Sequence, residues 1–229
     1  MSTKPDLIRD IDRVDADIVK QASAFPASIL ADVAGRRGTL CSRVAPLSPT
    51  MRLAGPAVTV EVRPGDNLMI HAAMAIAKPG DVLVIDGKGD ETSALLGEIM
   101  VGQCKKQGLA GLVIYGSVRD AEAIRLLDFP VYAIGNNPNG PTKLVPGRVN
   151  HPISVGGTSV NPGDLIVGDG DGVVVVEKDK AASLLPAAAK KVAYEQKRIA
   201  EIASGEALRP SWLEAELRKA GVLKEGEAL

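Results

Sequence analysis

The sequence predicts an α/β fold with parallel strands, on two observations. Between residues 57 and 134, short apolar segments rich in β-branched residues alternate with segments of helical period. The strand-like segments are 57–62, 81–85, 109–115 and 131–134, and the helical ones are 67–77, 94–107 and 119–127. This alternation is typical of parallel βαβ units. In addition, 45% of the 229 residues are hydrophobic but only 3% are aromatic, so small aliphatic side chains can build one large core.

The segments before and after this region have different patterns. Residues 15–34 favour a helix that is interrupted at Phe25-Pro26, because proline is tolerated near the start of a helix. The polar, glycine-bearing segment 86–91 is expected to be a loop that follows the second strand. Between residues 153 and 176, short β-rich segments are separated by Pro162-Gly163 and by a second glycine-bearing turn. This spacing indicates strands of a more antiparallel layer.

The C-terminal region is expected to be helical. Residues 179–198 form a long segment rich in Ala, Lys and Glu, and residues 211–220 form a second helical segment that ends near Gly221. We therefore expect a single domain over residues 1–229, in which residues 179–229 are a helical extension that contacts a neighbouring subunit.

Composition excludes several classes of protein. Lys and Arg number 27 against 28 Asp and Glu, a net charge of -1, whereas binding by phosphate neutralisation favours a basic chain. Two cysteines and two histidines without close pairs do not fit a structural zinc site, so a metal would be a hard cation held by carboxylates. The start of the chain shows no secretory signal, and no apolar run is long enough to span a membrane, so we expect a cytoplasmic protein with reduced thiols.

The candidate site lies at the carboxyl ends of the parallel strands, where open α/β sheets bind ligands. These ends are the segments 86–96 and 116–120, which match neither a dinucleotide fingerprint nor a P-loop. Arg119-Asp120 opens one helix, and Glu98 opens the preceding helix directly after Gly97, which permits a close approach of backbone N–H groups to an anion. Such a set suits a small anionic oxo acid chelated to a divalent cation. Taken alone, Asp120 would equally suit an ordinary helix start with Arg119 as its surface partner.

Several segments, in order and spacing, carry a resemblance to a known family. They are Pro64-Gly-Asp-Asn67, Pro79-Gly-Asp-Val82, Leu96-Gly-Glu98, Gly108-Leu-Ala-Gly111, Gly116-Ser-Val-Arg-Asp120, Asn161-Pro-Gly-Asp164 and Asp169-Gly-Asp-Gly-Val-Val-Val-Val176. From about residue 15 to 198 the chain resembles the class II pyruvate aldolases that cleave 4-hydroxy-4-methyl-2-oxoglutarate and 4-carboxy-4-hydroxy-2-oxoadipate. The same family includes the regulator of ribonuclease activity A (RraA) and related oxaloacetate decarboxylases. The resemblance implies a layered β/β/α domain of RraA-like, swivelling-domain type with a mixed central sheet.

The resemblance also implies the roles of individual residues. Backbone groups of Gly97, Glu98, Ile99 and Met100 would bind pyruvate, and Arg119 would contact its oxygens. Asp120 would be the direct ligand of Mg²⁺ or Mn²⁺, which suits a cation that keeps most of its waters. Asp32, Glu98 and Glu195, the last supplied by an adjacent subunit of a trimer or hexamer, would hold those waters. Lys143 would lie near the substrate.

The reaction implied is a retro-aldol cleavage of a 4-hydroxy-2-oxo acid to pyruvate and a second 2-oxo acid. Oxaloacetate decarboxylation passes through the same pyruvate enolate, so one site can support both. Two positions depart from the aldolases, which have Asp in place of Glu98 and Glu in place of Asp32. Members closer to the ribonuclease regulator carry the Gly-Glu form.

Alternative interpretations remain at this point. Lys88 or Lys143 could form a Schiff base with pyruvate, as in a class I aldolase. The chain could instead be an RraA-type regulator that binds RNase E without significant catalysis. A methyltransferase is disfavoured because a glycine-rich cofactor loop is missing from the sequence. His71 is interpreted as a core or pocket-wall residue rather than a general base.

Overall fold

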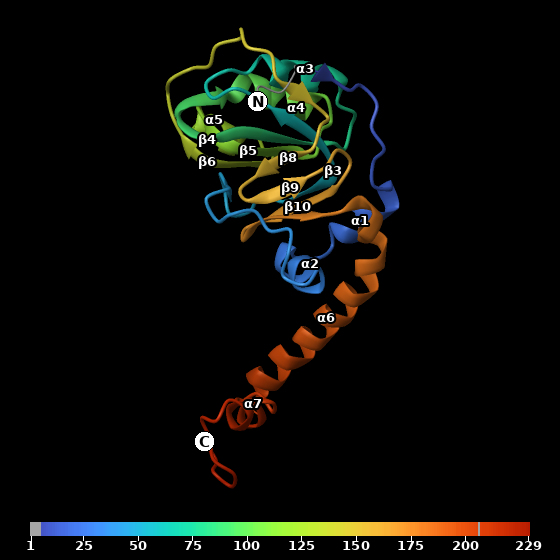
Figure 1. Cartoon of the computed structure of the whole chain (residues 1–229), viewed down its shortest axis with the longest axis vertical. Helices are drawn as coiled ribbons and strands as arrows, with labels where there is room; N and C mark the ends of the chain where they lie inside the picture. The colour runs from blue at the N-terminus through green and yellow to red at the C-terminus, as the bar shows by residue number, and fades with distance from the viewer. Residues whose placement is uncertain (1–5, 206) are drawn as a thin grey trace. The chain divides into compact units, whose positions relative to one another are not determined.

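The computed structural model describes residues 6–205 and 207–229, in two compact units that divide after Ala188. The first unit contains all the strands, and Figure 1 shows it as a sheet covered by helices. The division falls within the long helix α6 (Lys178–Ser204), some way after the start of the helical extension that the sequence suggests. The second unit contains the remainder of α6 and helix α7 (Leu213–Lys219).

Four parallel strands form the centre of the first unit and confirm the α/β prediction. In sheet order they are β3 (Leu53–Glu61), β4 (Val82–Leu96), β5 (Gly111–Val118) and β6 (Val131–Asn136). Each successive pair is joined through a helix, in order α3 (Leu68–Ile76), α4 (Glu98–Lys106) and α5 (Ala121–Leu126). Because consecutive strands are neighbours in one parallel sheet, their carboxyl ends lie along a single edge.

Antiparallel strands extend this sheet and confirm the mixed layer predicted for residues 153–176. The first half of β3 pairs with β10 (Leu165–Asp169), which pairs in turn with β11 (Gly172–Val176). A separate hairpin joins β8 (Ile153–Val155) and β9 (Thr158–Val160). Two-residue strands complete the edges: β1 (Asp6–Leu7), β2 (Ala45–Pro46) and β7 (Arg148–Val149).

The N-terminal helices break where the sequence predicts. Helix α1 (Ala16–Ala22) begins at Asp15, whose carboxylate accepts a hydrogen bond from the Asp17 N–H at 2.8 Å. Helix α2 (Ala27–Val33) begins directly after Pro26, which has an extended backbone and cannot continue the preceding helix.

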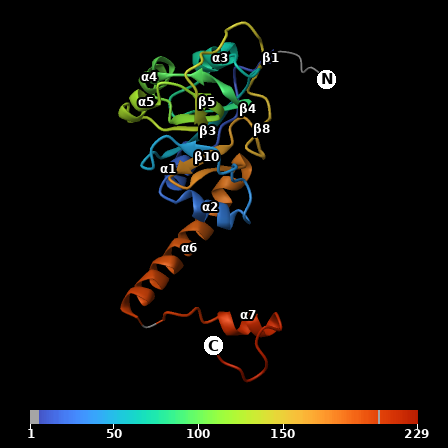
Figure 2. The same cartoon turned by 90° about the vertical axis from the view of Figure 1, so that its left-hand side faces the viewer.

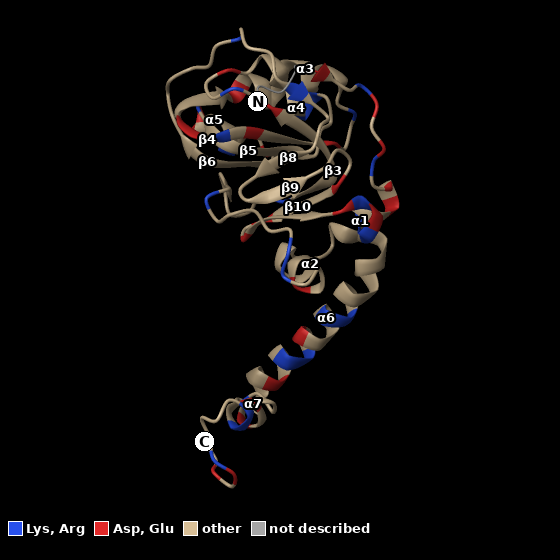
Figure 3. Ribbon diagram, viewed as in Figure 1, with Lys and Arg blue, Asp and Glu red and all other residues tan. Residues whose placement is uncertain are grey.

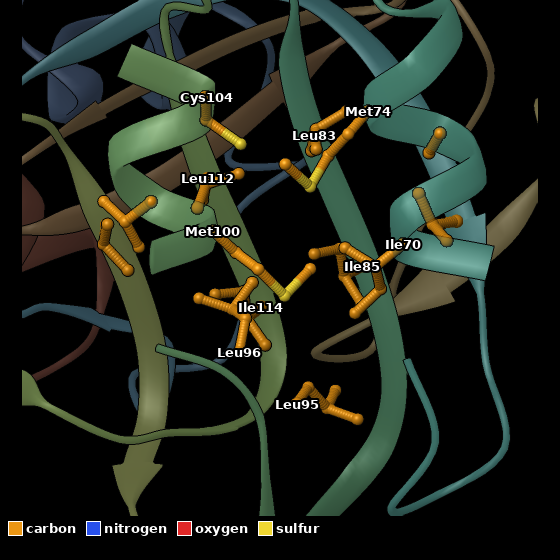
Figure 4. Packing of buried hydrophobic residues seen from close by; sticks show 14 of the residues in the cluster. Ile70, Met74, Leu83, Ile85, Leu95, Leu96, Met100, Cys104, Leu112 and Ile114 are labelled. Carbon is orange, nitrogen blue, oxygen red and sulfur yellow. The ribbon is translucent and has the colours of Figure 1, made fainter. Parts of the chain in front are cut away.

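The period of two along the central strands divides the core between the two faces of the sheet. Leu83, Ile85 and Ile114 pack against α3 and α4 on one face, as Figure 4 shows. Val84 and Val113 belong to a second cluster on the other face, which strands β8 to β11 join through Val155, Val160, Ile166, Val173 and Val175. Figure 2 shows helices α3 to α5 and strand β10 on opposite sides of the central strands. The structure is therefore layered β/β/α, as the resemblance implies.

Strand β4 corrects two expectations from the sequence. The segment 86–91 is part of this strand rather than a loop, and residues 94–96 also belong to it rather than to the following helix. Pairing with β5 continues through register shifts between Asp86 and Leu96, and Lys88 has a left-handed φ of 61°. Bulges allow a strand to include polar residues and a residue of positive φ. The pattern of polar and apolar residues in the sequence does not reveal these bulges.

The second unit has a strongly charged surface. Lys, Arg and Glu alternate along the second half of α6, as Figure 3 shows, and Lys191 lies 3.4 Å from Glu195. Pairs of this kind on one helix face stabilise it by about 0.3–0.5 kcal/mol each. Among the described residues, no helix is long and apolar enough to cross a membrane.

Candidate functional site

The site is built where β4 and β5 end side by side. The Arg119 N–H donates to the Leu96 carbonyl oxygen at 3.0 Å, so the turn after β5 is joined to the end of β4. Asp120 follows this turn and precedes α5 with a left-handed backbone, φ 56° and ψ 32°. Few residues other than glycine adopt this conformation, and strained backbone of this kind concentrates at functional sites.

The Asp120 carboxylate contacts the neighbouring helix rather than its own. Its Oδ2 accepts a hydrogen bond from the Glu98 N–H, the first of α4, at 3.1 Å. Asp120 makes no side-chain hydrogen bond to the start of α5, although it occupies the N-cap position there. The positive end of the α4 dipole therefore stabilises this carboxylate. The interpretation of Asp120 as an ordinary helix-start residue is not supported by this geometry.

Gly97 makes this contact possible. A Cβ atom at position 97 would lie 2.3 Å from Asp120 Oδ2 and 2.9 Å from Arg119 Cγ, distances that van der Waals radii forbid. The Gly97 backbone is itself extended, with φ −145°. The glycine is thus required for space, as the sequence suggested, although in this structure the space is filled by a carboxylate.

Six of the predicted site residues line one small hollow of about 170 Å³. They are Gly97, Ile99, Met100, Arg119, Asp120 and Lys143. Glu98 lies exposed next to them and contributes its backbone N–H. The hollow therefore combines a guanidinium, an ammonium, a helix N-terminus and a carboxylate within a volume suited to a small organic acid.

Arg119 and Asp120 also line a second hollow of about 280 Å³, with Asn136, Asn137 and Pro138. Both charged side chains are a little under half exposed, and Arg119 Nε lies 3.8 Å from Asp120 Oδ2. The two charged residues thus stand between two cavities, and a ligand larger than pyruvate could occupy both.

Two residues on the inner wall were not predicted as site residues. Asn67 is buried and lines the hollow, and its Nδ2 donates to the Leu95 carbonyl oxygen at 2.9 Å. This bond fixes the orientation of the amide, because only the NH₂ group can face a carbonyl. Within the part of the chain that the structure describes, Asn67 Oδ1 and His71 Nε2 are buried without hydrogen-bond partners. The sequence signal for Asn67 was the motif Pro64-Gly-Asp-Asn67, which entered only as one of the segments that carry the family resemblance.

His71 lines the hollow, which agrees with its interpretation as a pocket-wall residue. Burial, and then the nearby charge of Lys143, lower the pKa of the His71 imidazole below its ordinary value. The ring is therefore neutral at pH 7 and can act as a hydrogen-bond acceptor.

The structure does not place Asp32 at this hollow within one chain. Asp32 lies on α2 and lines a different cavity of about 350 Å³, together with Ser28, Arg36 and Thr39. Glu195 lies on the part of α6 that belongs to the second unit.

Lys88 is occupied by other contacts. Its Nζ donates to Asp86 Oδ2 at 2.6 Å and to Glu61 Oε1 at 2.8 Å. Burial opposes the charged form, but these hydrogen bonds outweigh it and raise the pKa of Lys88. A protonated, paired amine is a poor nucleophile, so the geometry disfavours an imine at this residue.

A metal at this site would have few protein ligands. In residues 6–205 and 207–229, no three His, Cys, Asp or Glu side chains are grouped as a metal site. At the hollow both contacts described above for the Asp120 carboxylate are made by Oδ2. A single protein carboxylate suits a hard cation that keeps most of its waters or takes oxygens from a ligand.

The chain is thus an α/β protein of layered β/β/α type, with a small, polar hollow at the carboxyl ends of its parallel strands, where open α/β sheets bind ligands. The chain belongs to the RraA-like family, described as Aldolase/RraA, which matches residues 11–175.

Known proteins of this family show high similarity to the chain. A protein of Halalkalibacterium halodurans named "Putative 4-hydroxy-4-methyl-2-oxoglutarate aldolase" is 40% identical over 186 residues, which cover 81% of this chain and 89% of that protein. Streptomyces coelicolor RraAS2, described as an unusual member of the RNase ES inhibitor RraA protein family, has a similar structure with a TM-score of 0.75. It is 28% identical and covers 82% of this chain and 98% of its own.

A second similar structure carries a different name. It is described as an S-adenosylmethionine:2-dimethylmenaquinone methyltransferase of Geobacillus kaustophilus. Its TM-score is 0.63 at 33% identity, over 69% of this chain and 98% of that one. The names within this fold therefore cover more than one activity, and the site must decide between them.

Proposed function

We propose that the protein is a divalent-metal-dependent lyase that cleaves a 4-hydroxy-2-oxo acid to pyruvate and a second 2-oxo acid, and that it also decarboxylates oxaloacetate. The observation that carries this proposal is the single hollow in which Arg119, Lys143, Asp120 and the start of α4 converge. An aldolase name on a relative 40% identical supports the same reaction class.

Asp120 is the residue that would hold Mg²⁺ or Mn²⁺, since oxygen donors suit both ions. When bound, such an ion supplies Lewis-acid stabilisation of negative charge on the 2-oxo acid. Because Asp120 is held by the Glu98 N–H, its carboxylate is oriented before any ligand arrives.

The other residues bind the substrate and stabilise charge. Arg119 and the N–H groups at the start of α4 would bind the carboxylate next to the 2-oxo group. The C4 hydroxyl proton leaves toward the Glu98 carboxylate at the rim, the C3–C4 bond breaks, and its electrons form the pyruvate enolate. A proton added at C3 then gives pyruvate. Arg119 stabilises the charge that develops on the enolate oxygen.

The direct test is a pyruvate-release assay coupled to lactate dehydrogenase, with oxaloacetate and several 4-hydroxy-2-oxo acids. We expect activity that EDTA removes and Mg²⁺ or Mn²⁺ restores. Arg119→Ala should lower kcat by about 10²–10³. The control is Arg125→Ala on the following helix, α5, which removes a guanidinium bonded to the Leu47 carbonyl oxygen, outside the hollow, and should leave kcat unchanged. Full turnover by Arg119→Ala, or trapping of pyruvate by borohydride, would contradict the proposal.

We also propose that a neighbouring copy of the chain completes the site, as a trimer or hexamer. The support is that Asp32 lines a separate cavity of its own chain, and that Glu195 lies on a charged helix in the second unit. Mixing inactive Arg119→Ala and Glu195→Ala proteins under conditions of subunit exchange should restore part of the activity, because some hybrid sites contain both native residues. If the mixture stays inactive while subunits exchange, Glu195 does not act across subunits.

The second candidate is a protein-binding regulator of an RNase E-type ribonuclease. The similarity to RraAS2 favours it, because that protein is described within an RNase ES inhibitor family. If no pyruvate is released from any substrate with or without Mg²⁺, and the chain slows RNA cleavage by such a ribonuclease, this candidate replaces the lyase.

A further inference from the structure

The tripeptide Pro-Gly-Asp occurs at three places in the first unit, at 64–66, 79–81 and 162–164. In each, the Asp N–H donates to the carbonyl oxygen of the residue before the proline, at 3.0 to 3.2 Å. The glycine has a positive φ in each turn, between 73° and 89°. Proline followed by a glycine of positive φ is the pattern of a type II turn. The three turns therefore have the same backbone, and all three carboxylates are buried.

Two of these aspartates close their own turns. The Asp81 carboxylate accepts from the Lys78 N–H at 2.7 Å, and the Asp164 carboxylate accepts from the Asn161 N–H at 2.8 Å. In both cases the donor is three residues before the acceptor, which is the ordinary role of an aspartate in a turn. Each carboxylate also accepts from one distant residue: Asp81 from the Arg13 guanidinium at 2.7 and 2.8 Å, and Asp164 from the Lys178 N–H at 3.0 Å.

Asp66 uses its carboxylate differently. Its Oδ2 accepts three hydrogen bonds from a segment more than 70 residues away: from Thr142 Oγ1 at 2.6 Å, the Leu144 N–H at 2.7 Å and the Val145 N–H at 3.1 Å. Its Oδ1 accepts from the Leu68 N–H at 3.0 Å, at the start of α3. One buried carboxylate therefore holds a remote loop and a helix start together.

The loop held in this way carries Lys143, which lines the hollow. Thr142, Lys143 and Leu144 are exposed, so apolar burial contributes little to their order. The same carboxylate also holds the start of α3, through the Leu68 N–H. Asn67, directly before Leu68, lines the hollow as well. Bonds to an ionised carboxylate are about twice as strong as neutral ones, which makes Asp66 the main side-chain restraint on this loop.

We propose that Asp66 is a positioning residue that fixes the ammonium group of Lys143 at the hollow for the carboxylate of an anionic substrate. This inference rests on the proposed function and deepens it, because it assigns a residue that controls substrate binding without touching the substrate. It accounts for the observation that, of the three turns, only that of Asp66 sends one carboxylate oxygen to three donors of a single remote loop.

The test is a double-mutant cycle with a matched control. Asp66→Asn keeps the size of the side chain, but its NH₂ group must face an N–H donor at one of the two oxygen positions. We expect its KM for a 4-hydroxy-2-oxo dicarboxylate to rise about tenfold, with kcat changed less than about twofold. Lys143→Met should raise KM in the same way, and adding Asp66→Asn to Lys143→Met should raise it no further. Asp164→Asn makes the same chemical change in the same turn and should leave KM unchanged.

The outcomes separate positioning from general loosening. If Asp66→Asn raises KM equally with and without Lys143, or if Asp164→Asn raises it as much, the inference is wrong. Should Asp66→Asn fail to fold, Thr142→Val removes one donor only and should raise KM in the same direction by a smaller factor.

A second readout does not depend on activity. Amide hydrogen exchange at Leu144 and Val145 should accelerate at least tenfold in Asp66→Asn and stay unchanged in Asp164→Asn. Unchanged exchange in Asp66→Asn would overturn the inference even in an active enzyme. A wild-type protein that releases no pyruvate, but shows the expected exchange, would instead refute the proposed function alone.

Discussion

Replacement of Gly97 by alanine tests whether the site depends on the contact between two helix starts. The new Cβ would lie 2.3 Å from Asp120 Oδ2. Non-bonded heavy atoms approach to about 3.5 Å, so the carboxylate must retreat by about 1 Å. That movement breaks its 3.1 Å hydrogen bond from the Glu98 N–H. The backbone at position 97 is extended and accepts alanine, so the steric effect falls on Asp120 and Arg119 alone.

The size of the effect follows from this displacement. A misplacement of 1 Å in a catalytic group costs about 10²-fold in rate, so kcat/KM for pyruvate release should fall about 10²-fold. The free energy of unfolding should fall by only about 1 kcal/mol, the value of one partly exposed hydrogen bond. Affinity for Mg²⁺ or Mn²⁺, measured by calorimetry, should fall together with the rate.

Gly102→Ala is the matched control on the same helix. A Cβ at position 102 meets nothing within 4 Å, so this variant should keep full activity. It should also gain about 0.5–1 kcal/mol, because alanine loses less entropy than glycine in a helix. The reasoning is refuted if Gly97→Ala retains more than a third of the wild-type kcat/KM while both variants are folded by circular dichroism.

Three further predictions follow from individual residues. Asp120→Gly relieves the left-handed strain but also loses the hydrogen bond from the Glu98 N–H, so the free energy of unfolding should change by less than about 1 kcal/mol while pyruvate release is lost; a variant that still releases pyruvate would contradict the assignment. Native protein should react with iodoacetamide at Cys41 only, because Cys104 is buried and burial raises the pKa of its thiol to about 12; mass spectrometry with and without urea checks this. Burial raises the pKa of the Asp66 carboxyl, but its four donors outweigh this and hold it below the ordinary 3.8. The stabilisation by Asp66 is therefore complete above about pH 4 and is lost as the pH falls through the lowered pKa. In denaturant titrations the stability difference between wild type and Asp66→Asn should shrink below that pH, and a constant difference would be inconsistent with an ionised Asp66.

The regular elements could be predicted because their periodicity matches their burial. Strand β5 is buried almost throughout and β6 over its first half, and these parts are continuous apolar runs, as is usual for parallel strands. Strand β4 could be predicted only to Ile85, since the polar residues that follow stay in the sheet through bulges. A bulge depends on pairing with a partner strand, and local sequence contains no information on that pairing.

The site was predictable as far as the topology of the sheet determines it. Arg119 and Asp120 were found because the carboxyl ends of adjacent parallel strands must meet. Asn67 was not found, since a buried amide at a helix start looks like an ordinary cap in the sequence. Asp66 was missed for the same reason, because Pro-Gly-Asp predicts a turn whichever way the carboxylate points. In the proposed oligomer, Asp32 and Glu195 act together with a neighbouring chain, which a single sequence does not specify.

The near-zero net charge of the chain hides a local imbalance that selects an anion. At the hollow, the one carboxylate that lines it, Asp120, is opposed by Arg119, by Lys143 and by the positive start of α4. The start of α4 and the Asp120 carboxylate are held together by the bond from the Glu98 N–H, so this part of the site is oriented before a charged ligand arrives. A cation bound to Asp120 would add to this positive potential rather than neutralise it. The site therefore favours a ligand with more than one negative group, such as a 2-oxo dicarboxylate, over a neutral molecule of the same size.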